Sequence, residues 1–327
     1  MQKKLWLLML TLVLAVGLTA CQEEQSNGGS SEQGNDKVEE KENQETSENS
    51  DNESFQSVTL TDKSGTEVTI NEKPERIVSV LPSATEIVYS VGAGEEVVGV
   101  SKWANYPEEV QDVEKVGDQQ LSIEKIVSLE PDLVVADLNN GDDVEALRNA
   151  GLNVLVLGSQ NLESVYEDID LVGQATGNVE KAQSIISQMK SEVEDVQNAV
   201  SDLSEDEKKD VWIEVGPELY SGGDGSFIDE LITLAGGNNI IGDQQGWPQV
   251  SEEVVLERNP DVIITTYGYY VEDAVEQVLA RKNWQDVKAI QEEQVYDFHG
   301  DLLTRPGPRL TEGLKKLAQT LYPELFN

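Results

Sequence analysis

The sequence predicts an α/β protein with two Rossmann-like lobes and mostly parallel sheets, joined by a single long helix, with a ligand cleft between the lobes. Three observations predict this fold: an internal repeat, short apolar runs that alternate with helical patterns, and one long helical segment without Gly or Pro. The repeat is the most informative of the three. Four residues recur 129 positions later: Ser122, Glu124, Pro131 and Asp132 return as Ser251, Glu253, Pro260 and Asp261.

A second pair of segments repeats in the same chain order. Residues 83–99 match residues 226–242 without a gap, at an offset of 143 positions. Only two copies occur, whereas a solenoid needs three or more repeats. We therefore expect two lobes of similar build, and proteins of this kind tend to bind ligands between their lobes.

The first residues have the layout of an export signal. Lys3 and Lys4 precede an apolar run from Leu5 to Ala20, which is short for a membrane span. An uncleaved amphipathic anchor is the alternative. Cys21, the only cysteine, directly follows Leu-Thr-Ala, and this pattern resembles the lipobox of bacterial lipoproteins. The resemblance implies cleavage before Cys21, lipidation of its sulfur and anchoring on the extracytoplasmic face of the cell membrane.

A polar segment follows the signal and is expected to be a disordered acidic tether. From Gln22 to Ser54 the only apolar residue is Val38, so this stretch cannot bury enough surface to offset its chain entropy. The whole chain carries 63 acidic and 23 basic residues, for a net charge of −40. Such a charge disfavours nucleic acid and anionic lipid as partners, so the lipid anchor is the only membrane contact expected. The acidity fits either a halophilic or alkaliphilic host or a plain need for solubility.

The predicted elements follow the tether in order. A hairpin is expected over Val58–Ile70, because the apolar alternation breaks at Lys63, Ser64 and Gly65. In the first lobe, four apolar strands are expected at Ile77–Val80, Val97–Val100, Leu133–Ala136 and Val154–Leu157. Helices near 85–91, 123–129 and 144–150 are expected to separate them. Continuous apolar strands separated by helices indicate a mostly parallel sheet that is covered on both faces.

A long helix is expected from Asn178 to Val200, because its apolar residues recur about every 3.6 positions. At 1.5 Å per residue it spans roughly 30 Å, enough to connect the lobes. The second lobe repeats the scheme with strands at 211–215, 240–241, 262–267 and 294–298, and with helices from 226, over 271–280 and over 310–321. The predicted division is a signal peptide 1–20, a tether 21–56, an N-terminal lobe 57–176, a connecting helix 177–203 and a C-terminal lobe 204–327.

Aromatic residues occupy loops that follow the predicted strands. Trp103, Tyr220 and Trp247 each lie in such a loop, and the loops of Tyr220 and Trp247 contain glycines. Ligands of sheets of this kind sit beyond the carboxyl ends of the strands. Aromatic side chains there supply rigid apolar contact with a polar tip, which suits a broad planar ligand. The other interpretation is that each aromatic only anchors its own loop.

From Pro74 to the C-terminus the chain resembles the ABC-transporter solute-binding lipoproteins with a rigid helical backbone, which deliver cobalamin or ferric siderophores. The resemblance is carried by residues 76–93, 121–135 and 246–264, and the last stretch is especially similar to the cobalamin-binding members. The resemblance implies capture of cobalamin (vitamin B12) between the lobes and its delivery to an ABC permease dimer with its ATPase subunits. A ferric-siderophore or haem binding protein for iron uptake is the alternative. No cofactor and no bound metal are expected; cobalamin enters only as the transported ligand.

The same resemblance assigns roles to individual residues. Trp103, Tyr220 and Trp247 would line a corrin pocket, and the second lobe would add Asp301 and Leu302. The chain departs from the cobalamin pattern because Gln119 or Gln120 and Asp137 stand where tryptophans are expected. Cobalamin, cobinamide, haem and ferric siderophores therefore stay open as ligands.

The repeated glutamates have two possible roles. The resemblance implies that Glu124 and Glu253 pair with arginines on the two permease subunits. Either residue alone also fits a helix start, where a carboxylate complements the helix dipole. Their matching places in the two lobes favour docking, in which exposed charges set orientation and encounter rate more than affinity.

Three further residues have open interpretations. Arg305 and Arg309 would meet an anionic group of the ligand, or else form an internal ion pair or cap backbone carbonyls. His299, the only histidine, would meet a haem iron or the axial position of cobalt, or simply face solvent; alone it makes no metal site. A secreted enzyme is the contrasting class, but the chain has no nucleophile elbow, Walker loop or dinucleotide-binding motif, so we expect no catalysis.

Overall fold

The computed structural model describes residues 55–118 and 120–326. The predicted signal peptide, the lipidation site Cys21, the tether up to Ser54 and Gln119 therefore lie outside the described residues. The chain from Glu53 to Asn327 forms one compact unit. No helix in the described part of the chain combines the length and the apolarity needed to cross a membrane.

The first lobe is built on a five-stranded parallel sheet in the order β5-β4-β3-β6-β7. Its strands are β3 (Ile77–Ser79), β4 (Val97–Val100), β5 (Glu114–Lys115), β6 (Leu133–Asp137) and β7 (Val154–Leu157), and its helices are α1 (Pro82–Ser90), α2 (Ile123–Ser128), α3 (Asp142–Asn149) and α4 (Leu162–Thr176). Short 3₁₀ turns lie at η1 (Glu108–Asp112) and η2 (Leu138–Asn140). An antiparallel hairpin, β1 (Val58–Thr61) and β2 (Glu67–Ile70), precedes the sheet as predicted.

The second lobe is built on a four-stranded parallel sheet in the order β11-β10-β8-β9. Its strands are β8 (Asp210–Glu214), β9 (Asn238–Asn239), β10 (Val262–Thr265) and β11 (Val295–Asp297), and its helices are α6 (Phe227–Leu234), α7 (Glu252–Arg258), α8 (Ala274–Leu279), α9 (Lys288–Gln291), α10 (Asp301–Thr304) and α11 (Leu310–Leu321). The 3₁₀ turns are η3 (Glu205–Glu207), η4 (Lys282–Trp284) and η5 (Pro323–Leu325). The predicted fold class of two α/β lobes with mostly parallel sheets is confirmed.

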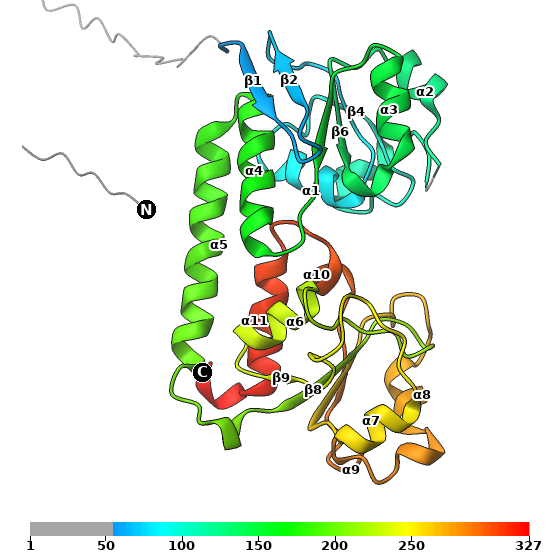
Figure 1. The fold of residues 1–327 in the computed structure, drawn as a ribbon, viewed down its shortest axis with the longest axis vertical. Coiled ribbons are helices and arrows are strands. Elements are labelled where there is room, and N and C mark those ends of the chain that lie inside the picture. The colour runs from blue at the N-terminus through cyan, green and yellow to red at the C-terminus, as the bar shows by residue number, and fades with distance from the viewer. Residues whose placement is uncertain (1–54, 119, 327) are drawn as a thin grey trace, which may run out of the picture. The chain divides into compact units, whose positions relative to one another are not determined.

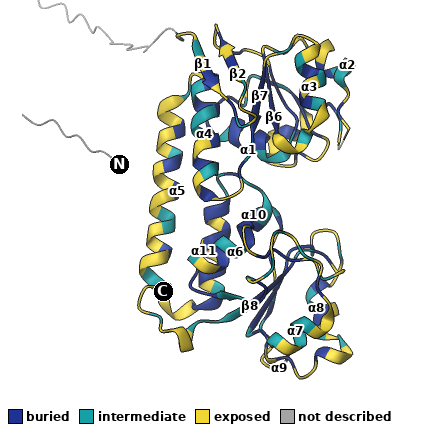
Figure 2. Cartoon of the chain, in the orientation of Figure 1, coloured by how far each residue is buried: buried dark blue, intermediate teal, exposed yellow. Residues whose placement is uncertain are grey.

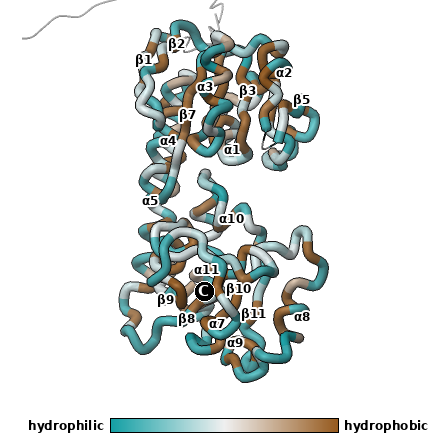
Figure 3. The backbone as a smooth tube through the Cα atoms, turned by 45° about the vertical axis from the view of Figure 1, so that its right-hand side comes forward, coloured by the Kyte–Doolittle hydropathy of each residue, from teal (hydrophilic) through white to brown (hydrophobic). Residues whose placement is uncertain are grey.

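Each sheet divides its buried residues between two apolar layers. In β6, Leu133 and Val135 join a core cluster that runs through both lobes, while Val134 and Ala136 join a cluster confined to the first lobe. This alternation is what a strand covered on both faces requires. Figure 3 shows apolar residues along β3 and β7, and Figure 2 shows the buried strands inside each lobe. The helices α1, α4, α5, α6 and α11 contribute to the shared cluster, so the lobes have one continuous apolar core.

The long helix α5 (Val179–Val200) packs against α4 of the first lobe and against α11 of the second (Figure 1). Its buried side chains include Ala182, Ile186, Met189 and Val196, and its opposite face is exposed (Figure 2). Gly173 of α4 lets the two helices approach closely, because a Cβ atom there would lie 2.4 Å from the Cβ of Ala182.

The internal repeat encodes the same turn from helix to strand in both lobes. Glu130 after α2 and Asn259 at the end of α7 have φ values of 47° and 44°, so both helices end on a left-handed residue before a proline. Asp132 then accepts hydrogen bonds from the backbone N–H groups of Glu75 and Arg76, both at 2.9 Å. Asp261 accepts one from the N–H of Asp210 at 2.8 Å. Each repeated aspartate therefore fastens the start of a neighbouring strand.

Several elements differ from the prediction, and β5, α9 and α10 were not predicted at all. The predicted strand at Ile240 and Ile241 is displaced, because β9 is Asn238–Asn239 and the two isoleucines follow it in a turn, buried in the second-lobe core. The helix predicted from residue 271 begins at Ala274. Helix α4 was not predicted either. It begins with a capping box, in which the Asn161 side chain accepts from the Ser164 N–H and the Ser164 hydroxyl oxygen accepts from the Asn161 N–H.

Candidate ligand-binding site

Exposed aromatic side chains gather on loops that follow the carboxyl ends of the strands in both lobes. The exposed fractions of Trp103, Tyr220 and Trp247 are 59%, 42% and 47%. Three further exposed aromatics lie on these loops: Tyr106 after β4, and Tyr269 and Tyr270 after β10. Exposed apolar surface of this kind, repeated at one edge of each sheet, is typical of a binding site.

In the second lobe, the loops that carry Tyr220 and Trp247 form one platform. The Ser221 N–H donates to the Pro248 carbonyl at 3.1 Å, and the Gly223 N–H donates to the Gly246 carbonyl at 2.8 Å. A Cβ atom at Gly223 would lie 2.1 Å from the Gln244 carbonyl oxygen, so only glycine permits this approach.

A buried polar cluster supports the third aromatic loop. Glu214, at the end of β8, is fully buried and accepts from the Tyr267 hydroxyl at 2.6 Å and from both terminal nitrogens of Arg281 at 2.6 and 2.8 Å. Burial, together with the Glu214 charge, raises the pKa of Tyr267, so its hydroxyl stays protonated and donates. Burial opposes the Arg281 charge, but Glu214 outweighs it and the pKa of Arg281 is raised. Tyr267 is thereby fixed at the base of the loop that carries Tyr270, whose N–H donates to the Tyr267 carbonyl at 3.1 Å.

His299 stacks on an aromatic ring of the same loop. Its ring centroid lies 4.8 Å from that of Tyr269, with an angle of 18° between the planes, and its Nδ1 lies 3.5 Å from Asp301 Oδ2. Tyr269 in turn meets Tyr270 edge-on at 4.8 Å. No group of three or more acidic, histidine or cysteine side chains placed to hold a metal ion occurs within residues 55–118 and 120–326.

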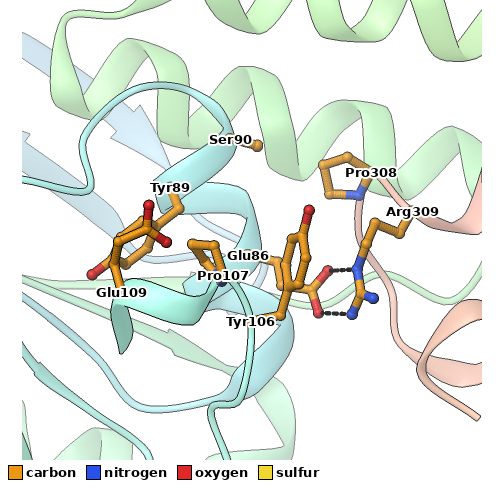
Figure 4. Close-up of a pocket in the computed structure, with 8 residues that line it drawn as sticks. All are labelled: Glu86, Tyr89, Ser90, Tyr106, Pro107, Glu109, Pro308 and Arg309. Atoms are coloured by element: carbon orange, nitrogen blue, oxygen red, sulfur yellow. Dashed lines mark hydrogen bonds and ion pairs between the residues drawn. The ribbon is translucent and has the colours of Figure 1, made fainter. Parts of the chain in front are cut away.

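Arg305 and Arg309 are held by protein groups. Arg305 Nη1 lies 2.6 Å from Glu86 Oε1, and its Nη2 lies 2.7 Å from Asp301 Oδ1. Arg309 donates to both Glu86 oxygens, at 2.9 and 2.6 Å (Figure 4). Of the alternatives drawn from the sequence, the structure shows the internal ion pair. The neighbouring Leu302 is buried, with an exposed fraction of 7%.

A pocket of about 330 Å³ adjoins this ion pair. Its walls are Glu86, Tyr89, Ser90, Tyr106, Pro107, Glu109, Pro308 and Arg309 (Figure 4). The Arg309 guanidinium lies 4.0 Å from the centroid of the Tyr106 ring. Burial, and secondarily the charge of Glu109, raises the pKa of Tyr89. The pocket thus joins residues of both lobes through aromatic, proline and paired charged groups.

The repeated glutamates lie on the surface of short helices. Glu124 is exposed on α2 and Glu253 is exposed on α7, and both helices lie on the far side of the lobes from α5 (Figure 1). Within the described residues neither carboxylate forms an ion pair. A hydrogen bond from Ser251 lowers the pKa of Glu253 and keeps it ionised. Both charges are therefore available to a partner surface.

Some residues at this site were not singled out from the sequence. Tyr106 lies on the loop that carries Trp103, and Tyr269 and Tyr270 follow another predicted strand; their position after strands was the available signal. Glu86 gave no signal, because it lies inside a helical pattern and its partner Arg305 is 219 positions away. Asp137, which replaces an expected tryptophan, is only 5% exposed; burial raises the pKa of its carboxyl group, and hydrogen bonds from Asn139 oppose this.

Comparison with known proteins gives a consistent result. The family model described as periplasmic binding protein matches residues 77–302. The chain is 41% identical over 276 residues to an uncharacterized ABC transporter substrate-binding lipoprotein, YvrC, of Bacillus subtilis, covering 82% of this chain and 87% of that protein. It is 30% identical over 275 residues to a cobalamin-binding protein of Halobacterium salinarum, covering 81% and 74% of the two chains.

Two solved structures are similar as well. The periplasmic vitamin B12 binding protein BtuF of Vibrio cholerae matches with a TM-score of 0.67 and 28% identity, over 77% of this chain and 98% of that chain. The periplasmic heme-binding protein RhuT from Roseiflexus sp. RS-1 matches with a TM-score of 0.69 and 27% identity, over 77% and 99%.

Proposed function

Because this chain belongs to the family of periplasmic binding proteins, we propose that it captures cobalamin between its two lobes and delivers it to an ABC permease. Proteins of this family are substrate-binding components of ABC importers, work with a permease and an ATPase, and are not enzymes.

The observation that carries the proposal is the set of exposed aromatics at the strand ends of both lobes. Trp103 belongs to the first lobe, whereas Tyr220 and Trp247 share a platform in the second. A corrin has wide apolar faces and polar amide edges, which suit aromatic walls with polar tips. The similarity to a cobalamin-binding protein and to a vitamin B12 binding protein supports the same ligand.

The second lobe would add contacts around α10. Asp301 and Arg305 lie at its two ends, and their side chains are 15% and 12% exposed. Leu302 is buried, so we propose that it supports this segment while polar atoms and backbone of the neighbouring residues face the ligand.

The protein is proposed to work at the cell membrane, anchored through a lipid on Cys21 and facing away from the cytoplasm. The similarity to a substrate-binding lipoprotein supports this location. Glu124 and Glu253, exposed and without an ion pair among the described residues, would then pair with arginines of the two permease subunits.

A ferric siderophore or haem is the second candidate ligand. Asp137 stands where the cobalamin pattern has a tryptophan, and the chain is also similar to a heme-binding protein. His299, stacked on Tyr269 and 43% exposed, offers an imidazole on the ligand side of the second lobe. Asp137 and His299 are the features of this chain that support an iron complex as the second candidate.

Isothermal titration tests the proposal. The chain from residue 21 on, with Cys21→Ser to prevent lipidation, is titrated with cyanocobalamin, cobinamide, haem and ferric hydroxamate and catecholate siderophores. We expect one-to-one binding of cyanocobalamin with a dissociation constant below about 1 μM, corresponding to more than about 8 kcal/mol. Binding of a siderophore or haem without binding of cobalamin would move the protein to iron uptake. Heat from none of these probes would contradict both candidates.

A further inference from the structure

Charged side chains connect the two lobes at a cluster that shares Asp301 and Arg305 with the proposed ligand site. Glu86 and Asn105 come from the first lobe, and Asp301, Arg305 and Arg309 come from the second. We call these five residues the seam cluster. Glu86 accepts from Arg305 at 2.6 Å and from Arg309 at 2.9 and 2.6 Å, and Asp301 lies 2.7 Å from Arg305. Each ion pair of Glu86 in the seam cluster therefore joins the first lobe to the second.

The four charged residues of the seam cluster are largely shielded from water and balanced in charge. The exposed fractions of the side chains are 3% for Glu86, 12% for Arg305, 15% for Asp301 and 20% for Arg309. Burial disfavours the charge on Arg309, but Glu86 outweighs burial and raises the pKa of Arg309. Removing one carboxylate from such a group leaves a guanidinium without compensation, which costs far more than breaking an exposed pair. The two carboxylates of Glu86 and Asp301 balance the charges of the two guanidiniums.

The cluster also holds the loop that carries Trp103. The Asn105 side chain donates to Asp301 Oδ2 at 3.2 Å and accepts from Arg305 Nη1 at 2.7 Å. The next residue, Tyr106, lies with its ring 4.0 Å from the Arg309 guanidinium (Figure 4). The aromatic loop of the first lobe is thus fastened to the arginines of the second.

A second contact between the lobes lies elsewhere and fixes a different element. Glu230 of α6 accepts from the N–H of Leu162, at the start of α4, at 2.9 Å. This contact and the shared apolar core hold the helices together. The seam cluster instead reaches the loop that carries Trp103, through Asn105 and Tyr106.

We propose that Glu86 is a positioning residue, which acts through Arg305 and Arg309 to hold Asn105 and Tyr106 and thereby sets the spacing between the aromatic walls of the two lobes. Its consequence for ligand choice rests on the proposed function, since it assumes that the ligand binds between those walls. Ligands whose width matches the fixed spacing bind with little rearrangement, and narrower or wider ones must break buried ion pairs.

Hydrogen exchange without any ligand tests the positioning role. In the full chain purified in mild detergent, amide exchange is measured by mass spectrometry for the wild type, Glu86→Gln and Asp62→Asn. Asp62 is the matched control, because its carboxylate is equally buried and lies 2.6 Å from Arg148, but both residues belong to the first lobe. We expect Glu86→Gln to speed exchange over residues 101–107 and 300–309 by at least about tenfold, as the loss of hydrogen bonds to charged groups predicts. Asp62→Asn should leave both segments unchanged.

Wild-type exchange in Glu86→Gln, or an equal increase in Asp62→Asn, would overturn the proposal. A second variant decides the case if Glu86→Gln does not fold. Asn105→Ala removes an exposed side chain and keeps the pairs of Glu86 with both arginines. It should speed exchange over 101–107 and leave 300–309 at the wild-type rate; an unchanged 101–107 would contradict the role of Asn105.

The dissociation rate of the ligand distinguishes a change in the placement of the loop from a general loss of stability. With the probe that binds in the titration panel, Asn105→Ala should raise the dissociation rate by at least about fivefold at an unchanged midpoint of thermal unfolding, because only the placement of the loop changes. An unchanged dissociation rate would show that ligand binding does not depend on the hydrogen bonds of Asn105 to the second lobe. Absence of binding by every probe would count against the proposed function and would leave the exchange experiment to decide on the seam cluster.

Discussion

At the scale of single residues, the repeated glutamates make the clearest prediction. Replacing Glu124 and Glu253 by Gln should lower uptake of the ligand in cells and leave its affinity in solution unchanged. Exposed pairs contribute about 0–1 kcal/mol each, so each single change should lower uptake by at most about fivefold and the double change should multiply the two effects. Uptake of labelled ligand checks this, with Glu180→Gln, an exposed first-turn glutamate of α5, as control. Equal uptake in the double variant and the wild type would contradict docking through these residues.

Asp261 supplies a residue-scale prediction that depends on pH. Burial favours its protonated form, but hydrogen bonds from Lys288 and from the Asp210 N–H outweigh burial, and its pKa is lowered. A lowered pKa stabilises the fold above the aspartate pKa of the unfolded chain, and this stabilisation is lost as the pH falls through the folded value. Asp261→Asn should therefore reduce the free energy of unfolding at pH 7 by about 1.5–3 kcal/mol.

Urea unfolding of both proteins across the acid range checks the sign. The difference between wild type and Asp261→Asn should shrink as the pH falls below the usual aspartate range. Asp243→Asn is the control, because Asp243 pairs with Arg258 on an exposed surface and its loss should change stability little. A difference that grows on acidification would contradict the assigned hydrogen bonds.

The sequence predicted the role of a residue where that role depends on its neighbours along the chain. The αL turn, proline and aspartate of the repeat are local, so the equivalence of Asp132 and Asp261 was visible at once. Arg305 was left with several interpretations, because its partner Glu86 lies 219 positions earlier and only the folded chain brings them together. Long-range pairing of charges leaves no periodic signal in one sequence.

At the scale of elements, a substitution at the contact between α4 and α5 would change helix propensity and packing in opposite directions. Gly173→Ala would raise helix propensity by about 0.8–1.0 kcal/mol, but its new methyl would lie 2.4 Å from Ala182. Overpacking of this kind costs about 1–3 kcal/mol, so we expect a net loss of stability. Thermal unfolding checks this, with Ser187→Ala on the exposed face of α5 as control. A higher unfolding temperature for Gly173→Ala would mean that α4 and α5 separate easily.

Elements with a strong period were predicted well, and short or weakly patterned ones were not. The continuous period over residues 178–200 predicted α5, and the alternation over 58–70 predicted the hairpin. Helix α4 was missed although it has 15 residues, and β9 was placed two residues late because its own residues, Asn238 and Asn239, are polar. A two-residue edge strand takes its place from pairing with β8, which no local pattern reveals.

At the scale of the whole molecule, two lobes of one plan place aromatic loops at corresponding sheet edges. The repeat and the strand and helix patterns predicted a bilobal protein, and the family resemblance of residues 76–93, 121–135 and 246–264 predicted a solute-binding protein. The precise cleft was beyond such reasoning, because the ion pairs between the lobes, the platform of Tyr220 and Trp247 and the stack of Tyr269 on His299 are tertiary contacts.

The central claim is that aromatic residues of both lobes hold one ligand. Its most direct test is titration of the wild type, Trp103→Ala, Trp247→Ala and the double variant with cyanocobalamin, or with the siderophore or haem that binds in its place. Val179→Ala, an exposed apolar residue of α5, is the control. A buried aromatic contributes about 1.5–3 kcal/mol, so each single change should weaken binding roughly ten- to hundredfold at a stoichiometry of one. Loss of affinity from one lobe only, with the other tryptophan dispensable, would contradict capture between the lobes.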